Sequence, residues 1–172
     1  MTLKEQTADS HARAEATSFM KAVFEKRMTK EAWTDFTFQK YLMYDVLELK
    51  ADTYNLLDDI QDIKRAKLLK EDFDIMSTGP VKPRPSVQSY MTYITNLHDP
   101  AKIMAHIYVW HMGDLFGGQM IKKIVEGSHK SLEFTDVTAL KEKIRAKLDD
   151  SMGAEANVAF EYAIKILNSY KI

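Results

Sequence analysis

The sequence contains no cysteine, few prolines and glycines, and no long apolar run. The absence of cysteine excludes disulfides, thiolate metal sites, iron–sulfur clusters and a cysteine nucleophile, so any metal must bind through histidine, carboxylate or tyrosine. No uninterrupted apolar stretch approaches the roughly 20 residues of a membrane-spanning helix, and residues 1–16 lack the apolar centre of a secretion signal. We therefore expect a soluble protein that is neither exported nor embedded in a bilayer.

The charges are balanced, with 24 Lys and Arg against 25 Asp and Glu and a formal net charge of -1. Such a total does not favour binding to nucleic acid or to a membrane surface, so partners must be inferred from local patterns. The 172 residues, 45% of them hydrophobic, suit one domain over residues 1–172. A domain of this size buries roughly 70% of its unfolded surface.

The hydrophobic periodicity predicts an all-α fold, and no stretch alternates in the way that strands do. Three of the four prolines fall between Gly79 and Pro85, which marks the principal loop. A Thr2-x-x-Glu5 capping box, Thr29 and Pro100 predict three helix starts. The expected helices cover residues 3–16, 30–57, 65–75, 86–97, 100–112 with a helical pattern continuing to 125, 137–150 and 154–170.

The most unusual local feature is Gly113-Asp114-Leu115-Phe116-Gly117-Gly118, which lies inside a strong helical pattern. Each glycine costs roughly 1 kcal/mol relative to alanine in a helix interior, so this cluster needs a reason. Bare backbone allows a helix to bend or to lie directly against a large flat ligand, although close helix–helix packing, or a break between two helices, is the better explanation of the glycines taken alone. Asp114 favours a ligand site, where it can hold an ordered water.

Two further pairs of polar residues are of interest. In each pair the two residues are four positions apart, so they lie on the same face of a helix. His11 and Glu15 suit a metal ligand whose second ring nitrogen donates to a carboxylate, or alternatively an exposed histidine with an ion-pair partner. Lys141 and Arg145 suit a clamp for a carboxylate or phosphate, or alternatively an ordinary solvated face.

Taken together, these segments resemble the haem oxygenase family. Leu3–Thr7, followed by His11 and Glu15, is similar to the proximal helix of the family, and Pro100–Lys123 is similar to its distal helix almost position by position. The resemblance covers most of the chain, from Leu3 to about Tyr170. Because no apolar tail follows, the chain looks more like the soluble enzymes of bacteria, plastids or phages of photosynthetic microbes.

The resemblance implies a single-domain helical fold with haem held between the proximal and distal helices. It implies that O2 and external electrons convert haem, both substrate and cofactor, to biliverdin, carbon monoxide and ferrous iron. His11 would be the axial iron ligand, and Asp114 with Gly113, Gly117 and Gly118 would form the catalytic distal side. The residues expected to contact haem are Lys4, Glu15, Tyr108, Lys141, Arg145, Asn157 and Phe160.

The sequence departs from the family pattern at two distal positions: Trp110 stands where many relatives have Arg, and Phe116 where many have Ser. These changes make a non-catalytic haem or bilin carrier the first alternative. A di-iron protein of the ferritin type is the second, although the chain has only one Glu-x-x-His motif, at 126–129. A bare helical bundle, in which His11 and the glycines merely pack, is the third.

A chain without cysteine or a nucleotide-binding glycine motif cannot gather its own electrons, so we expect ferredoxin or another reductase as donor, and a bilin reductase downstream. A basic rim that can dock an acidic ferredoxin comprises Lys122, Lys123, Lys130, Lys141 and Lys143. We expect a cytoplasmic location, or the host cytoplasm if the chain is phage-encoded, with no transit peptide. The other histidines are expected to be structural or exposed: His98, His106, His111 and His129.

Overall fold

The computed structural model describes all 172 residues and is entirely helical, which confirms the predicted fold class. It contains nine α-helices joined by short loops and three 3-10 turns. The helices are α1 (Leu3–Glu15), α2 (Ser18–Phe24), α3 (Lys30–Thr53), α4 (Ala66–Met76), α5 (Pro85–Thr95), α6 (Pro100–Phe116), α7 (Gly118–Ile124), α8 (Val137–Arg145) and α9 (Gly153–Asn168). The 3-10 turns are η1 (Gln61–Ile63), η2 (Lys130–Leu132) and η3 (Asp150–Met152).

The predicted helix starts are confirmed by their caps. Thr2 accepts from the backbone N–H of Glu5, whose side chain returns the bond to Thr2, so the capping box is complete. Thr29 caps α3, and Pro100 occupies the first turn of α6 behind the capping Asp99. Side chains that satisfy free N–H groups therefore set where these helices begin.

The predicted boundaries are wrong at three places. Helix α2 was not expected, although Thr17 caps it in the same manner as the other threonines. Helix α3 stops at Thr53, and Asn55 then adopts a φ of 55°, a left-handed conformation that ends a helix. Helix α8 stops at Arg145, and residues 146–149 form turn and loop before η3 begins at Asp150.

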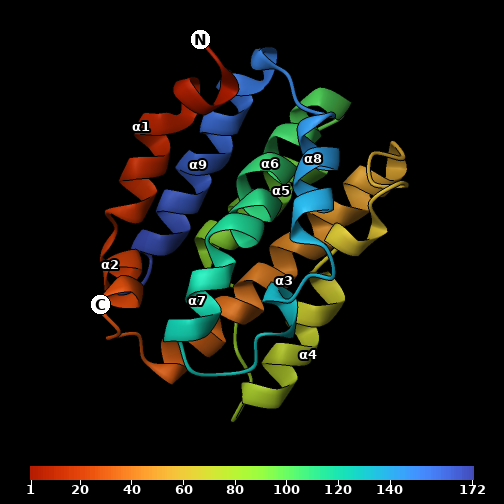
Figure 1. Cartoon of the computed structure of the whole chain (residues 1–172). Coiled ribbons are helices and arrows are strands. Elements are labelled where there is room, and N and C mark those ends of the chain that lie inside the picture. Colours follow the sequence, from red (N-terminus) through yellow and green to blue (C-terminus); the bar gives the residue numbers. More distant parts are fainter.

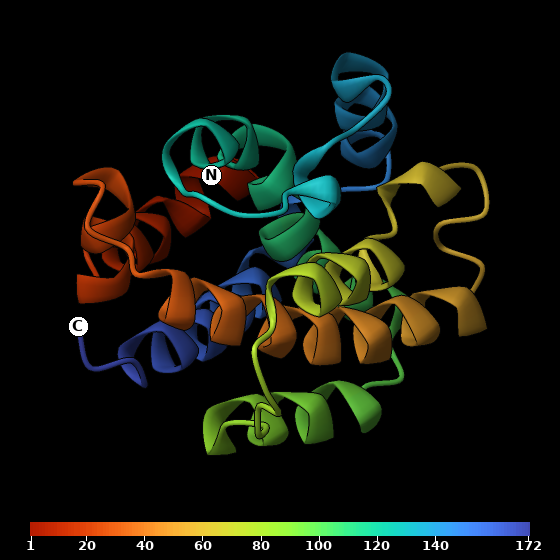
Figure 2. The ribbon, with the colours of Figure 1, turned by 90° about the horizontal axis from the view of Figure 1, so that it is seen from below.

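Helix α3 is the central element of the fold. It packs against α4, α5 and α6, while α9 packs against α1, α5 and α6. Figure 1 shows α1 lying along α9, and Figure 2 shows α3 crossing between α5 on one side and α7 on the other. A continuous cluster of 34 buried residues, centred on side chains such as Tyr44, Leu47 and Ile107, fills the space between these helices.

The segment after α7 is held in place by one buried carboxylate. Asp72 on α4 is fully buried and accepts from the Ser128 hydroxyl and from the backbone N–H groups of Lys130 and Ser131. These bonds satisfy the carboxylate away from water and fix the direction in which the chain leaves α7. No helix in the structure has both the length and the apolar composition needed to span a membrane.

Candidate functional site

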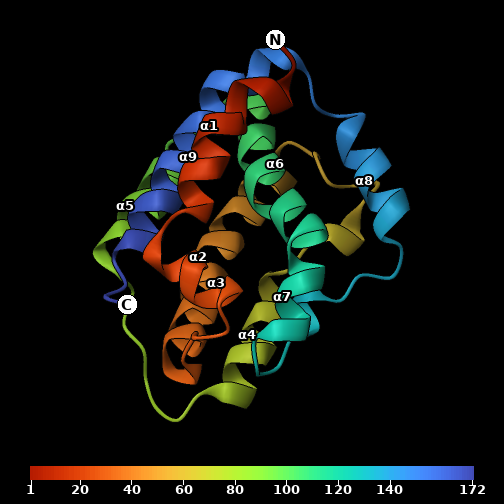
Figure 3. The ribbon, with the colours of Figure 1, turned by 60° about the vertical axis from the view of Figure 1, so that its left-hand side comes forward.

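A cavity of about 920 Å³ lies between α1 and α6, with parts of α3 and α9 completing its walls. Its volume falls near the upper end of the range for small-molecule sites, roughly 300–1,000 Å³. In Figure 3, α1 and α6 run on opposite sides of this region, and α6 continues below it into α7. The cavity therefore separates the two helices that carry the predicted histidine and the predicted glycine cluster.

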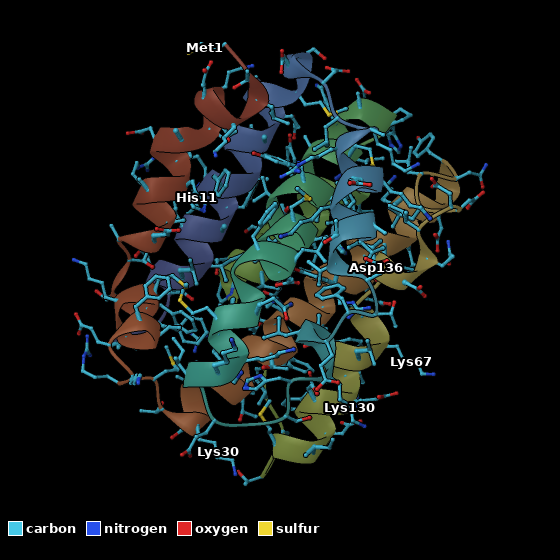
Figure 4. The ribbon with its side chains drawn as sticks, in the orientation of Figure 1. Met1, His11, Lys30, Lys67, Lys130 and Asp136 are labelled. Atoms are coloured by element: carbon cyan, nitrogen blue, oxygen red, sulfur yellow. The ribbon has the colours of Figure 1, made fainter.

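His11 lies on the α1 wall, and its side chain is 61% exposed. Its Nε2 atom is 3.3 Å from Oε1 of Glu15, one turn further along α1. The edge of the ring contacts Phe160 of α9, with ring centroids 5.9 Å apart and planes at 83°. Figure 4 labels His11 on the side of α1 that faces α9. Because the Glu15 carboxylate lies beside Nε2, Nδ1 is the ring nitrogen left free for a ligand in this conformation.

Polar contacts with the C-terminal part of the chain hold α1 in its place across the cavity from α6. The Leu3 N–H donates to Asp150, and the Asn157 side chain donates to the backbone carbonyl of Gln6. Arg13 pairs with Glu161 of α9, and this pairing lowers the pKa of the Glu161 carboxyl. Because α1 rests on α9, it leaves the cavity open toward α6.

The glycine cluster divides into two kinds of position. Gly113 and Gly117 line the cavity: a Cβ on Gly113 would meet no atom within 4 Å, and one on Gly117 would meet only the Gly113 carbonyl oxygen, at 3.3 Å. Gly118 does not line the cavity, because a Cβ there would lie 2.9 Å from Cδ2 of Leu132. Bare backbone thus faces the cavity at two glycines, while the third allows close packing.

Asp114 lies between these glycines on the cavity wall, and both of its carboxylate oxygens are hydrogen-bonded. Lys40 Nζ donates to Oδ1 and Tyr44 OH donates to Oδ2, each at 2.7 Å. Burial, followed by the charge of Asp114 and this hydrogen bond, raises the pKa of Tyr44 well above its usual value. Tyr44 is therefore a hydrogen-bond donor throughout the physiological pH range.

Lys40 is a site residue that the sequence analysis missed. It is only 7% exposed and lines the cavity from α3. A signal for it was present, because Lys40 falls four residues after Phe36 and four before Tyr44, on the buried stripe of the helix. A charged residue in such a stripe indicates a buried partner, but the partner lies 74 residues away in the sequence.

The predicted haem contacts are only partly brought together. The cavity wall includes Lys4, Glu15, Tyr108, Arg145 and Phe160. Two predicted contacts, Lys141 and Asn157, do not line the cavity. The Lys141 ammonium instead lies 3.7 Å from the ring centroid of Phe116, and Asn157 is engaged with Gln6.

The two departures from the family pattern have distinct surroundings. Trp110 lines the cavity and is 9% exposed, and its Nε1–H donates to Tyr90 OH at 3.0 Å. Tyr90 in turn bonds Nδ1 of His106 at 2.6 Å, so the indole is tied to a buried polar network. Phe116 is 48% exposed at the cavity mouth, beneath the side chains of Lys141 and Arg145.

Two of the four remaining histidines are fully buried and paired with carboxylates, as expected of structural residues. Nε2 of His106 lies 2.7 Å from Glu155, and Nε2 of His111 lies 2.8 Å from Glu48. Glu48 also accepts the N–H groups of Arg65 and Ala66 at the start of α4. These pairs do not form a cluster of three or more His, Asp or Glu side chains able to hold a metal ion, and no other such cluster occurs.

Comparisons with known proteins give matches of a single description. The family model described as heme oxygenase matches residues 1–152. The heme oxygenase of Rhodella violacea is 24% identical over 96% of this chain and 84% of its own length, and heme oxygenase 2 of Rattus norvegicus is 30% identical over 96% and 63%. The chain therefore spans a little less than two thirds of the rat protein.

Solved structures of the same name share the fold. The heme oxygenase of Leptospira interrogans superposes with a TM-score of 0.88 at 24% identity, covering 98% of this chain and 97% of its own. Heme oxygenase-1 of the cyanobacterium Synechocystis, solved in complex with heme, gives a TM-score of 0.87 at 24% identity, covering 97% and 89%.

Proposed function

This chain belongs to the haem oxygenase family, whose known activity is the degradation of haem to biliverdin, and we propose how its own residues perform that reaction. Haem would bind in the cavity between α1 and α6, where His11 on the α1 wall would hold the iron and Asp114 lies on the α6 wall. Bound haem supplies the iron at which O2 is activated and is itself the substrate, yielding biliverdin, carbon monoxide and ferrous iron.

One observation carries this proposal: a single cavity has an imidazole on one wall and, on the other, bare helix backbone bearing a buried carboxylate. The imidazole suits an iron ligand, because Glu15 lies 3.3 Å from one ring nitrogen and leaves the other for the metal. The absence of side chains at Gly113 and Gly117 allows a flat macrocycle to approach α6 closely. The residues present therefore fit haem.

The residues around the cavity have separate tasks in this arrangement. Gly113 and Gly117 set how close the ligand plane lies to α6, and so exclude bulk water from that face. Asp114, held by Lys40 and Tyr44, retains free lone pairs with which to accept hydrogen bonds from ordered water. Such water would be placed to supply protons on the α6 side of a bound haem, and Phe160 packs against the imidazole of His11 with the ring planes at 83°.

Cationic side chains at the cavity rim hold the haem propionates. Lys4 and Arg145 lie on the wall and offer donors to two carboxylates, and the Tyr108 hydroxyl lies nearby, 3.4 Å from that of Thr7. Lys141 is one turn from Arg145 and joins them once its ammonium leaves the ring of Phe116. These contacts with the propionates would set the orientation in which haem binds, and so would influence which biliverdin isomer is formed.

Electrons come from an outside donor, since the chain carries no cysteine for an iron–sulfur cluster. We propose ferredoxin, an acidic protein that a basic surface attracts. The docking surface consists of lysines on α7, η2 and α8: Lys122, Lys123, Lys130, Lys141 and Lys143. A cytoplasmic setting, with a bilin reductase that consumes the product, completes the proposal.

The test is to mix the apoprotein with hemin and follow the visible spectrum, first alone and then with ascorbate or reduced ferredoxin. Formation of a Soret band that then gives way to biliverdin absorption is expected. A Soret band that persists under both reductants would identify a carrier, and no Soret band would refute haem binding. Charge reversal at Lys122 and Lys123 should slow the ferredoxin-driven reaction and leave the ascorbate-driven one unchanged; equal slowing of both would overturn the docking surface.

A further inference from the structure

A lysine ammonium is buried in the cavity wall beside the only carboxylate of α6. Lys40 Nζ lies 2.7 Å from Asp114 Oδ1, and the two side chains are 9% and 11% exposed. The ammonium also lies over the rings of Tyr44 and Phe36, 5.2 and 5.9 Å from their centroids. Because both charged residues line the cavity, this ion pair is directly beside the space proposed for haem.

Stability alone does not explain such a pair. Burying two charges costs desolvation energy that their mutual attraction roughly repays, and apolar side chains of the same volume often serve as well or better. Neighbours on the same stripe of α3, such as Phe36 and Tyr44, show that this layer accommodates large apolar side chains. The presence of a charge at position 40 therefore points to a task at the cavity.

The ammonium group of Lys40 has N–H donors that bond to no protein acceptor. A lysine has three N–H donors, and the hydrogen bond to Asp114 uses one of them. No second acceptor is bonded to Nζ in the structure, so two donors remain beside the cavity. Trp110, one turn before Asp114 on α6, supplies no donor there because its N–H is bonded to Tyr90. Lys40 on α3 is thus the cation nearest to the catalytic carboxylate.

We propose that Lys40 is a positioning residue of the reaction. Its ammonium fixes the orientation of the Asp114 carboxylate, and one of its free N–H groups donates a hydrogen bond to water or to a small anionic ligand held between Asp114 and the haem. The inference rests on the proposed function, because it requires haem in the cavity with its open face toward α6.

Azide binding to the ferric haem complex tests this role without turnover. Azide is an anion that accepts hydrogen bonds, so the loss of a charged donor should weaken its binding by about tenfold or more. We expect that loss in Lys40→Met, which keeps the length of the side chain, and near wild-type affinity in Lys40→Arg, which keeps charge and donors. Lys30→Met, an exposed lysine at the start of the same helix, is the matched control and should bind azide as the wild type does.

Two results overturn the inference while leaving the proposed function intact: unchanged azide affinity in Lys40→Met, or equal losses in the Met and Arg variants, which would indicate packing. Lys40→Met leaves the buried Asp114 carboxylate without its cation. If the variant fails to fold for that reason, Asp114→Asn is compared with the double variant Lys40→Met, Asp114→Asn. Azide affinity about tenfold lower in the double variant supports the role, and equal affinity refutes it. Failure of the wild type to give a Soret band with hemin would instead refute the proposed function itself.

Discussion

Gly113→Ala should make the apoprotein more stable and its haem complex weaker. The added methyl group would meet no atom within 4 Å, so the substitution introduces no clash in the empty protein. Alanine is favoured over glycine within a helix by about 0.5–1 kcal/mol. For a chain of this size, that gain corresponds to a rise in Tm of about 1–4 °C.

The same methyl group protrudes into the space that haem is proposed to occupy. Inserting a methyl group into a filled site costs about 1–3 kcal/mol, so the Kd for hemin should rise about 5- to 150-fold. Thermal unfolding of the apoprotein and a spectroscopic hemin titration measure the two effects. A variant that gains stability and binds hemin as tightly as the wild type would refute the claim that this backbone contacts the macrocycle.

Two other glycine substitutions serve as comparisons for Gly113→Ala. Gly118→Ala places its methyl 2.9 Å from Leu132, so the clash offsets the helix gain and the Tm should stay level or fall. Gly79→Ala, in the exposed loop before α5, also meets no atom within 4 Å, so it can gain stability by restricting the unfolded chain but should leave hemin affinity unchanged. A stability gain in Gly118→Ala equal to that in Gly113→Ala would contradict the division of the glycine cluster.

Three further predictions concern the ligand, the rim and a buried pair. His11→Ala should lose turnover, and free imidazole should restore part of the Soret spectrum and of the activity; full turnover without imidazole would exclude His11 as the axial ligand. Arg145→Glu should weaken hemin binding or change the biliverdin isomer more than Lys141→Glu does, because only Arg145 lines the cavity; chromatography of the products and hemin titration decide. Burial alone would raise the pKa of the Glu155 carboxyl, but hydrogen bonds from His106 and Tyr93 outweigh burial and lower this pKa below its ordinary 4.5. Its carboxylate therefore contributes stability that is present above pH 4.5 and lost as the pH falls through the lower folded value. Urea unfolding across this range should show the gap between wild type and Glu155→Gln closing as the pH drops, and a constant gap would contradict the assignment.

The elements that sequence reasoning found are those whose signals are local. Capping threonines, a proline in a first turn and a histidine one turn from a glutamate act within four residues, so Thr2, Thr29, Pro100 and the His11–Glu15 pair were all recognised. Helix ends were harder to predict, because α3 and α8 stop where loop geometry outweighs the apolar pattern.

Apart from α2, whose Thr17 cap is a local signal, the details that sequence reasoning missed depend on contacts between distant segments. Gly118 differs from Gly113 only because Leu132 packs against it, and Asn157 turns from the cavity because it bonds to Gln6. Lys40 pairs with Asp114, which lies on another helix and is distant in the sequence. Spacing along one helix predicts which residues share a face, but it does not predict what the rest of the fold brings against that face.

The support of α1 by α9 has a consequence for biosynthesis. Helix α1, which carries the proposed iron ligand, is synthesised well before the residues that hold it: Asn157 follows its partner Gln6 by 151 positions, and Glu161 follows Arg13 by 148. A nascent chain displays the imidazole without its scaffold, and contacts of such long sequence separation form late in folding. We therefore expect haem binding to require a chain that has been synthesised through α9, and a stalled or truncated translation product that ends before α9 should not bind haem.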